Sequence, residues 1–234
     1  MLVNFGCYRA ANGGLFMAKF DAVLFDFDGT VADTGEGVFC GVRHAIDVYG
    51  LKQPSDTEIR KFIGPPMVTS FKYFYPELPD EKIQGLIKCF REKYAEVGLD
   101  MYRLYDGLEV LLKKLSENGI KAAVASSKPQ DFLEKIIKSS GMDKYFDCIV
   151  GASKNFADSD KATIVGAAME QTGVTDKSRI LMVGDRKFDI VGAHKVGIAC
   201  AAVLFGYGSR EEFEEYHADY IVKSFKEVEE LVMG

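Results

Sequence analysis

Five short apolar runs, separated by segments with helical spacing, are the feature that most constrains how this chain can fold. The runs are rich in strand-forming residues, and they lie at Ala22–Phe27, Lys121–Ser126, Cys148–Gly151, Arg179–Gly184 and Ala199–Leu204. Bounded runs of this kind, apolar almost throughout, are typical of parallel strands that are buried on both faces. A segment with apolar residues at helical spacing precedes each of the four later runs, at 106–118, 129–140, 160–172 and 188–196. This alternation predicts an α/β fold, with an open parallel sheet that carries helices on both faces.

The interval between the first two runs breaks this rhythm. Residues 28–120 separate them, whereas a strand-to-strand crossover needs only about 10–12 residues. The interval contains no convincing strand but several helical stretches, separated by glycines and prolines, at 37–49, 57–62, 67–74 and 80–97. We therefore expect an all-helical cap domain at 36–105, inserted into a Rossmann-like α/β core domain formed by 19–35 and 106–234.

Composition excludes several classes of protein. A formal net charge of −6 argues against sequence-independent nucleic-acid binding, which depends on Lys and Arg contacts to phosphates. The longest uncharged stretch, 196–209, is too short and too rich in glycine for a bilayer span of about 20 residues. The five cysteines are scattered without a CxxC pair, which favours free thiols and a reducing cytoplasm.

The first 18 residues differ from the rest of the chain. They carry a single charge, at Arg9, and lack the basic segment and apolar run of a secretory signal. We expect an N-terminal extension at 1–18, with Met17 as an alternative start of the protein.

Polar residues follow the ends of the predicted strands, where an open α/β sheet binds its ligands. They come from the first, second and fourth runs and from the helix after the third, and they are Asp26, Asp28, Gly29, Ser126, Ser127, Asp185, Asp189 and Lys161. Carboxylates crowded in this way repel one another unless a cation compensates. Oxygen ligands together with a substrate phosphate suit Mg²⁺. The sequence therefore predicts a Mg²⁺ site that receives a phosphate.

These residue types can transfer a phosphoryl group. One carboxylate can attack phosphorus to give an aspartyl-phosphate, and a second can protonate the leaving group and then activate water. A hydroxyl and a lysine can hold the phosphoryl oxygens, and Gly29 can present a backbone N–H to them. The alternatives are structural, because Ser126 and Ser127 can cap a helix ahead of Pro129, and Asp189 can be a helix-terminal acid favoured by the dipole.

The order and spacing of these residues resemble the four motifs of the haloacid dehalogenase superfamily. The matching segments are 26–30 (DFDGT), Ser126, Lys161 and 184–189 (GDRKFD), and the resemblance covers about residues 20–234. The insertion, with Gly64 and Pro65 in a turn between its helices, looks like the helical cap of the phosphoglycolate phosphatase-like branch. One departure is Ser127, which stands where many members of the family have an asparagine.

The resemblance implies a role for each matching residue. Asp26 would be the nucleophile, and Asp28 the general acid and base. Ser126, Ser127 and Lys161 would bind the phosphoryl group. Mg²⁺ would be bound by the side chains of Asp26 and Asp185 and by the backbone carbonyl of Asp28. Asp189 would orient a metal-bound water, and Gly64 and Pro65 would form the cap loop over the substrate.

The function expected from these features is a Mg²⁺-dependent phosphatase that hydrolyses small phosphate monoesters, with phosphoglycolate as the first substrate to consider. A 5′-nucleotidase, a pyrophosphatase and a mutase of the β-phosphoglucomutase type are alternatives on the same scaffold. A receiver-like signalling module, which is phosphorylated on an aspartate, is an alternative of another class. It needs neither Asp28 nor a helical lid, so both features favour an enzyme. The sequence leaves open whether the protein is a monomer or a dimer.

Overall fold

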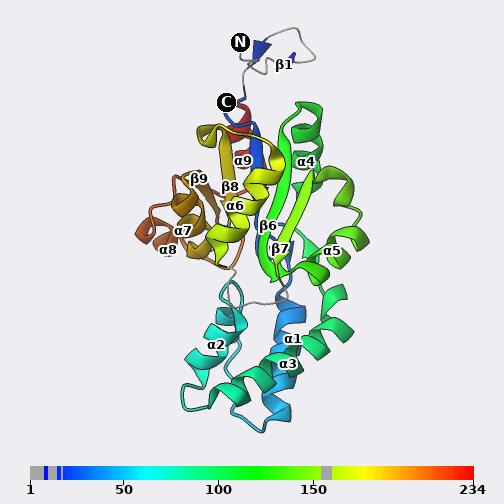
Figure 1. Cartoon of the computed structure of the whole chain (residues 1–234), viewed down its shortest axis with the longest axis vertical. Helices are drawn as coiled ribbons and strands as arrows, with labels where there is room; N and C mark the ends of the chain where they lie inside the picture. Colours follow the sequence, from blue (N-terminus) through cyan, green and yellow to red (C-terminus); the bar gives the residue numbers. More distant parts are fainter. Residues whose placement is uncertain (1–7, 10–14, 17, 154–159) are drawn as a thin grey trace.

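A sheet of six parallel strands forms the centre of the larger part of the molecule (Figure 1). The computed structural model describes residues 8–9, 15–16, 18–153 and 160–234. In spatial order the strands are β10 (Tyr220–Val222), β9 (Ala199–Val203), β8 (Ile180–Gly184), β3 (Ala22–Phe25), β6 (Lys121–Pro129) and β7 (Cys148–Ala152). All neighbouring pairs are parallel. The predicted α/β class and open parallel sheet are confirmed, and β10 is an edge strand that the apolar pattern did not reveal.

Helices cover both faces of the sheet, as the continuous apolar runs required. On one face lie α4 (Leu108–Glu117), α5 (Gln130–Ser139) and α9 (Phe225–Met233), and on the other α6 (Lys161–Thr172), α7 (Lys187–Val196) and α8 (Arg210–Glu215). Successive side chains of a strand point to opposite faces. Val23 and Phe25 therefore enter one apolar cluster, and Ala22 and Leu24 enter the other.

The order of the strands creates a switch point beside β3. The chain runs outward from β3 to β6 and β7, then returns to the other side of β3 as β8 and continues to β9 and β10. Phe25 pairs with both Val124 and Val183. The residues that follow these strands therefore meet at one edge of the sheet, at the place where open α/β sheets bind ligands.

Three helices with an apolar cluster of their own lie beyond this edge, at the lower end of Figure 1. They are α1 (Gly35–Val48), α2 (Met67–Phe74) and α3 (Asp80–Glu96), joined through the 3₁₀ turn η1 (Ile59–Phe62). We call this part, residues 35–100, the helical part. Its helices occur where the spacing of apolar residues predicted them, except that the stretch at 57–62 forms only the 3₁₀ turn.

The chain enters and leaves the helical part along two short paired strands. β4 (Ala32–Asp33) pairs antiparallel with β5 (Arg103–Leu104), which follows the 3₁₀ turn η2 (Gly98–Asp100). The sequence pattern showed no strand between 28 and 120, because two residues are too few to produce a periodic signal. The remaining short elements are β1 (Tyr8–Arg9), β2 (Leu15–Phe16), η3 (Asp143–Tyr145) and η5 (Lys177–Arg179).

Some of the expectations from sequence fall outside the described residues. The expected N-terminal extension at 1–18 does so for the most part, as do Met17 and Cys7. Within the described residues, Cys40, Cys89, Cys148 and Cys200 are free thiols. No helix in the described part of the chain has the length and apolar character needed to cross a bilayer.

Candidate active site

Asp26 stands at the end of the central strand β3 and is almost completely buried. Its backbone N–H donates to the carbonyl of Val183 at 2.9 Å, which extends the pairing of β3 with β8 by one residue. Its Oδ1 lies 2.8 Å from Nζ of Lys161. Burial raises the pKa of Asp26 to about 6; the charge of Lys161 opposes this shift, and the charges of Asp189 and Asp28 add to it.

Lys161 joins two of the carboxylates. It is the first residue of α6, and its buried Nζ lies 2.8 Å from Oδ1 of Asp26 and 2.8 Å from Oδ1 of Asp189. Gly192 on α7 leaves room for this side chain, since a Cβ there would lie 2.8 Å from Cγ of Lys161. Burial opposes the charge of Lys161, but the two carboxylates outweigh it and raise the pKa of the lysine.

Asp189 caps the first turn of α7 and also contacts Lys161. Its Oδ2 accepts the backbone N–H groups of Asp185 at 3.1 Å and Arg186 at 3.0 Å, which stabilises the first turn of α7. Its Oδ1 forms the ion pair with Lys161. Asp189 is therefore a helix-terminal acid that also belongs to the buried carboxylate cluster.

Asp185 completes this cluster. It is fully buried, and its Oδ2 accepts the backbone N–H of Tyr207 at 2.7 Å, whereas its Oδ1 has no hydrogen-bond partner within the described residues. Burial, with the nearby charges of Asp189 and Asp26, raises its pKa well above the usual range. One carboxylate oxygen from each of Asp26, Asp185 and Asp189 lies within 4.8 Å of the others. An unpartnered buried oxygen beside two further carboxylates fits a hard divalent cation such as Mg²⁺.

Asp28 has a different set of partners from Asp26. Its Oδ1 accepts hydrogen bonds from Oγ1 of Thr34 at 2.5 Å and from Nζ of Lys128 at 2.8 Å. Lys128 is buried, and its Nζ lies 4.8 Å from the centre of the ring of Tyr94 on α3. Burial alone would lower the pKa of Lys128, but the charge of Asp28 outweighs it and leaves the pKa raised.

No role was predicted for Lys128 from the sequence. A usable signal was present, because this lysine follows Ser126 by two residues at the carboxyl end of a strand. Tyr94 carried no comparable signal, since aromatic residues on a helix are far more often part of a core.

The three remaining residues of the predicted phosphate site contribute in different ways. Oγ of Ser126 accepts the N–H of Lys128 at 3.3 Å, so its own O–H can donate to a ligand. Ser127 is half-buried beside it. The N–H of Gly29, expected to bind phosphate, instead donates to the carbonyl of Ala32 at 2.8 Å. In this structure Gly29 serves the turn: its φ is 85°, and a Cβ there would lie 2.1 Å from Oδ2 of Asp185.

A cavity of about 600 Å³ lies between the sheet edge and the helical part. Its lining includes six of the residues predicted from sequence, Asp26, Asp28, Gly64, Pro65, Ser126 and Ser127. Lys161, Asp185, Asp189 and Gly29 are not in the lining. The carboxylates of Asp26 and Asp28 thus face both the cavity and the buried charges behind it.

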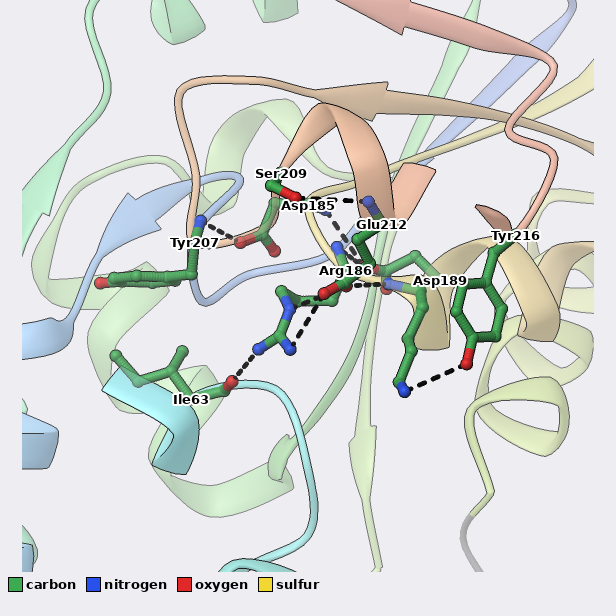
Figure 2. Close-up of polar contacts among 9 residues, drawn as sticks. Ile63, Asp185, Arg186, Asp189, Tyr207, Ser209, Glu212 and Tyr216 are labelled. Carbon is green, nitrogen blue, oxygen red and sulfur yellow. Dashed lines mark hydrogen bonds and ion pairs between the residues drawn. The ribbon is translucent and has the colours of Figure 1, made fainter. Parts of the chain in front are cut away.

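Arg186 ties the sheet edge to the helical part. Figure 2 shows its guanidinium between Glu212 and the backbone of Ile63. Nε donates to Oε1 of Glu212 at 3.0 Å, Nη2 donates to Oε2 at 3.4 Å, and Nη1 donates to the carbonyl of Ile63. The next residue is Gly64, where φ is 105° and a Cβ would lie 2.9 Å from Nη1. The loop at Ile63 and Gly64 therefore lies so close to Arg186 that a side chain at position 64 would meet the guanidinium.

Tyr207 makes a second connection of this kind, and Figure 2 shows its hydrogen bond to Asp185. Its N–H binds Asp185, and its hydroxyl donates to Oδ1 of Asp33 at the end of β4. The guanidinium of Arg60 in η1 lies 5.8 Å from the centre of its ring. Tyr207 lies outside the matching motifs, and Arg186 lies within the segment 184–189 but had no predicted role, because the partners of both residues are distant in the chain.

The close approach at Gly29 can be tested by substitution. Gly29→Ala and Gly50→Ala both place a side chain at positive φ, which costs about 1–2 kcal/mol. Gly50 has no atom within 4 Å of the new Cβ, whereas Gly29 meets Asp185 and Tyr207. We expect Gly29→Ala to lose about 1–3 kcal/mol more than Gly50→Ala in urea unfolding of the metal-free protein. Equal losses would contradict the contact.

The bond from Arg186 to the loop can be tested by amide hydrogen exchange. In Arg186→Ala we expect the hydrogen-bonded amides of the segment 63–70, those of Ile63, Thr69 and Ser70, to exchange at least about tenfold faster, because a hydrogen bond from a charged group contributes about 1.5–3 kcal/mol. Arg210→Ala, which removes only an exposed pair with Glu214, is the matched control and should leave this segment unchanged. Unaltered exchange in Arg186→Ala would show that the bond does not hold the loop.

Comparison with known proteins agrees with this geometry. The family model for haloacid dehalogenase-like hydrolases matches residues 23–203. A 5′-nucleotidase from Pseudomonas aeruginosa is 30% identical over 198 residues, which cover 85% of this chain and 89% of the nucleotidase. The tyrosine-protein kinase PtkA of Mycobacterium tuberculosis is 31% identical over 209 residues, covering 89% of this chain and 70% of the kinase. The crystal structure of a predicted phosphatase from Clostridium acetobutylicum is 34% identical, with a TM-score of 0.85 and coverage of 90% of this chain and 97% of the other. The chain therefore belongs to the haloacid dehalogenase-like hydrolases.

Proposed function

We propose that this hydrolase is a Mg²⁺-dependent phosphatase that acts on phosphate monoesters through an aspartyl-phosphate formed on Asp26. The observation that carries the proposal is the pair of carboxylates from one turn, which line the same cavity but have different partners. Asp26 is paired with Lys161, and Asp28 with Lys128 and Thr34. Such a difference in environment lets one carboxylate attack while the other transfers protons.

The residues that would hold Mg²⁺ are Asp26 and Asp185 through their side chains and Asp28 through its backbone carbonyl, with Asp189 beside them. Four carboxylates face only two ammonium groups, Lys161 and Lys128, in the described part of the site. When bound, the cation would offset this negative charge toward an incoming phosphate and polarise the phosphoryl group.

The first half of the reaction forms the intermediate. Lys161 pairs with Oδ1 of Asp26, so the carboxylate is held in one orientation toward the cavity. An oxygen of Asp26 forms a bond to phosphorus while the bond from phosphorus to the leaving oxygen breaks. Asp28 gives its proton to that oxygen, and the alcohol departs.

The second half regenerates the enzyme. Asp28, now a carboxylate, takes a proton from a water molecule that attacks phosphorus, and phosphate leaves Asp26. Thr34 and Lys128 both bind Oδ1 of Asp28, which leaves its other oxygen for proton transfer. The hydroxyl of Ser126 and the ammonium of Lys161 bind phosphoryl oxygens as charge develops on them.

Not all of the alternatives from sequence remain. Membership in a hydrolase family, with relatives named as a 5′-nucleotidase and a pyrophosphatase, overturns the receiver-like signalling module. Those names, and that of a predicted phosphoglycolate phosphatase among the structural neighbours, belong to the relatives. Phosphoglycolate, nucleoside monophosphates, pyrophosphate and a mutase reaction stay as proposals for this chain.

The phosphatase proposal is tested by turnover of p-nitrophenyl phosphate with Mg²⁺. We expect EDTA to abolish activity reversibly, and Asp26→Asn to lower kcat by at least about a thousandfold, since the nucleophile is removed. Asp143→Asn, an exposed aspartate in η3, is the matched control and should keep full activity. Metal-independent turnover, or an active Asp26→Asn, would refute the proposal.

Binding of Mg²⁺ should depend on pH in a defined direction. The pKa of Asp26 in the metal-free protein is raised from 3.8 to about 6. Between these values the folded state holds a proton that the unfolded chain releases, so this group makes stability fall as pH rises. Mg²⁺ needs the ionised carboxylate and relieves that loss. We therefore expect Mg²⁺ to raise Tm more at pH 7.5 than at pH 5, with a smaller increase in Asp26→Asn. An equal or larger effect at pH 5 would contradict this account.

A further inference from the structure

The cavity above the carboxylates has a polar floor and apolar walls. The floor comes from the sheet edge, where Asp26, Asp28 and Ser126 supply charge and a hydroxyl. The walls come mostly from the helical part, and their side chains are mainly aliphatic or aromatic. A cavity with a polar end and a larger apolar remainder suits a ligand whose charge is confined to one end.

Three aromatic rings form a continuous wall of this cavity. Phe90 and Tyr94 on α3 stack with ring centres 5.6 Å apart, and Tyr94 also contacts Phe132 on α5 at 5.6 Å. The same Tyr94 lies beside Lys128, the partner of Asp28. The wall therefore begins at the reacting end of the cavity. Phe90 is 7% and Tyr94 2% exposed, so another planar ring can contact only the part of each that lines the cavity, in the offset or edge-on arrangements that aromatic pairs prefer.

Helix α3 gives the length of the cavity. Gln84, Ile87, Arg91 and Tyr94 all line it, and their spacing of three or four residues places them on one face of the helix. From Tyr94 to Gln84 this face extends about 15 Å, at 1.5 Å per residue. Gln84 can also donate hydrogen bonds, so an acceptor group on a bound ring has a partner there.

Short, charged leaving groups fit this cavity poorly. The glycolate of phosphoglycolate, or the second phosphate of pyrophosphate, would leave most of the length of α3 uncovered. Apart from Arg91 and from Lys128, which pairs with Asp28, the lining offers a second negative charge no cationic side chain, and an unpaired charge there loses its hydration. A leaving group with an apolar ring avoids both costs.

We propose that the substrates of this site are phosphate monoesters whose leaving alcohol carries an aromatic or heteroaromatic ring, bound against the wall of Phe90, Tyr94 and Phe132. This rests on the proposed phosphatase function and deepens it, since the phosphate stays on the polar floor while the ring sets specificity. The ring contributes binding in the ground state and in the transition state alike, so its effect belongs to KM rather than to kcat.

The test compares 2-phenylethyl phosphate with ethyl phosphate. Both release a primary alcohol of similar acidity, so the chemical step is matched and the ring is the difference. We expect kcat/KM to be at least about tenfold higher for the phenyl ester, through a lower KM. Phosphoglycolate should be no better than ethyl phosphate. Equal values for the two alkyl esters would overturn the proposal and leave the phosphatase function standing.

Two variants test whether the lower KM expected for the phenyl ester arises from this cavity. Val68 on α2 is half-buried and lines the cavity, whereas Val110 on α4 is 58% exposed and does not. Val68→Asn should raise KM several-fold for 2-phenylethyl phosphate and leave ethyl phosphate unchanged. Val110→Asn should change neither. A Val68→Asn variant that affects both esters equally would contradict the assignment of the ring to this cavity.

Affinity measurements test the proposed binding of the ring independently of turnover. If neither ester is hydrolysed, the proposed function fails, and calorimetry with two inert phosphonates still tests the cavity. With Mg²⁺ present, 3-phenylpropylphosphonate should bind at least about tenfold more tightly than propylphosphonate. Equal affinities would overturn the proposal for the ring.

Discussion

The crowding of four aspartates at one end of the central strands is the constraint on which the rest of the site depends. Two of them meet a single buried ammonium, Lys161, and a third meets Lys128. Asp185 receives only a backbone N–H among the described residues, and one of its oxygens has no partner. Placing so much charge out of water is costly unless every group is paired. The negative charge that is not paired therefore favours the binding of a cation and, together with the cation, of a phosphate.

Backbone geometry makes this crowding possible. β3 and β8 are neighbours because the chain returns from β7 to the other side of β3. Phe25 pairs with Val183, so Asp26 lies level with Gly184 and Asp185 follows one residue further along. Glycines remove the Cβ atoms that would obstruct the aspartates. Gly29 and Gly184 both stand where a side chain would lie little more than 2 Å from an aspartate.

Much of the sheet and the carboxylate cluster could be predicted from sequence, because both depend on short-range patterns. Buried strands produce apolar runs, and the residues that follow them must meet at the carboxyl edge. The paired strands β4 and β5 were too short to produce a pattern, and β10 was not marked by an apolar run of its own. Arg186 and Tyr207 depend on contacts between distant segments, which no local spacing encodes. Lys128 follows Ser126 closely enough to be a candidate, but its pairing with Asp28 is visible only in three dimensions. The N–H of Gly29 was assigned to phosphate because the turn that uses it is visible only in three dimensions.

The antiparallel pairing of β4 with β5 affects how the inserted helical part can change during evolution. The two crossings of the chain into the helical part run side by side, at the spacing of adjacent strands, which is about 4.8 Å. A gap of that width can be closed by a tight turn. The two ends of the insertion are therefore adjacent in space, and the core does not need the insertion to connect them. The α/β core, with its charges, can thus keep one chemistry while the segment between Asp33 and Arg103 is lengthened, shortened or exchanged.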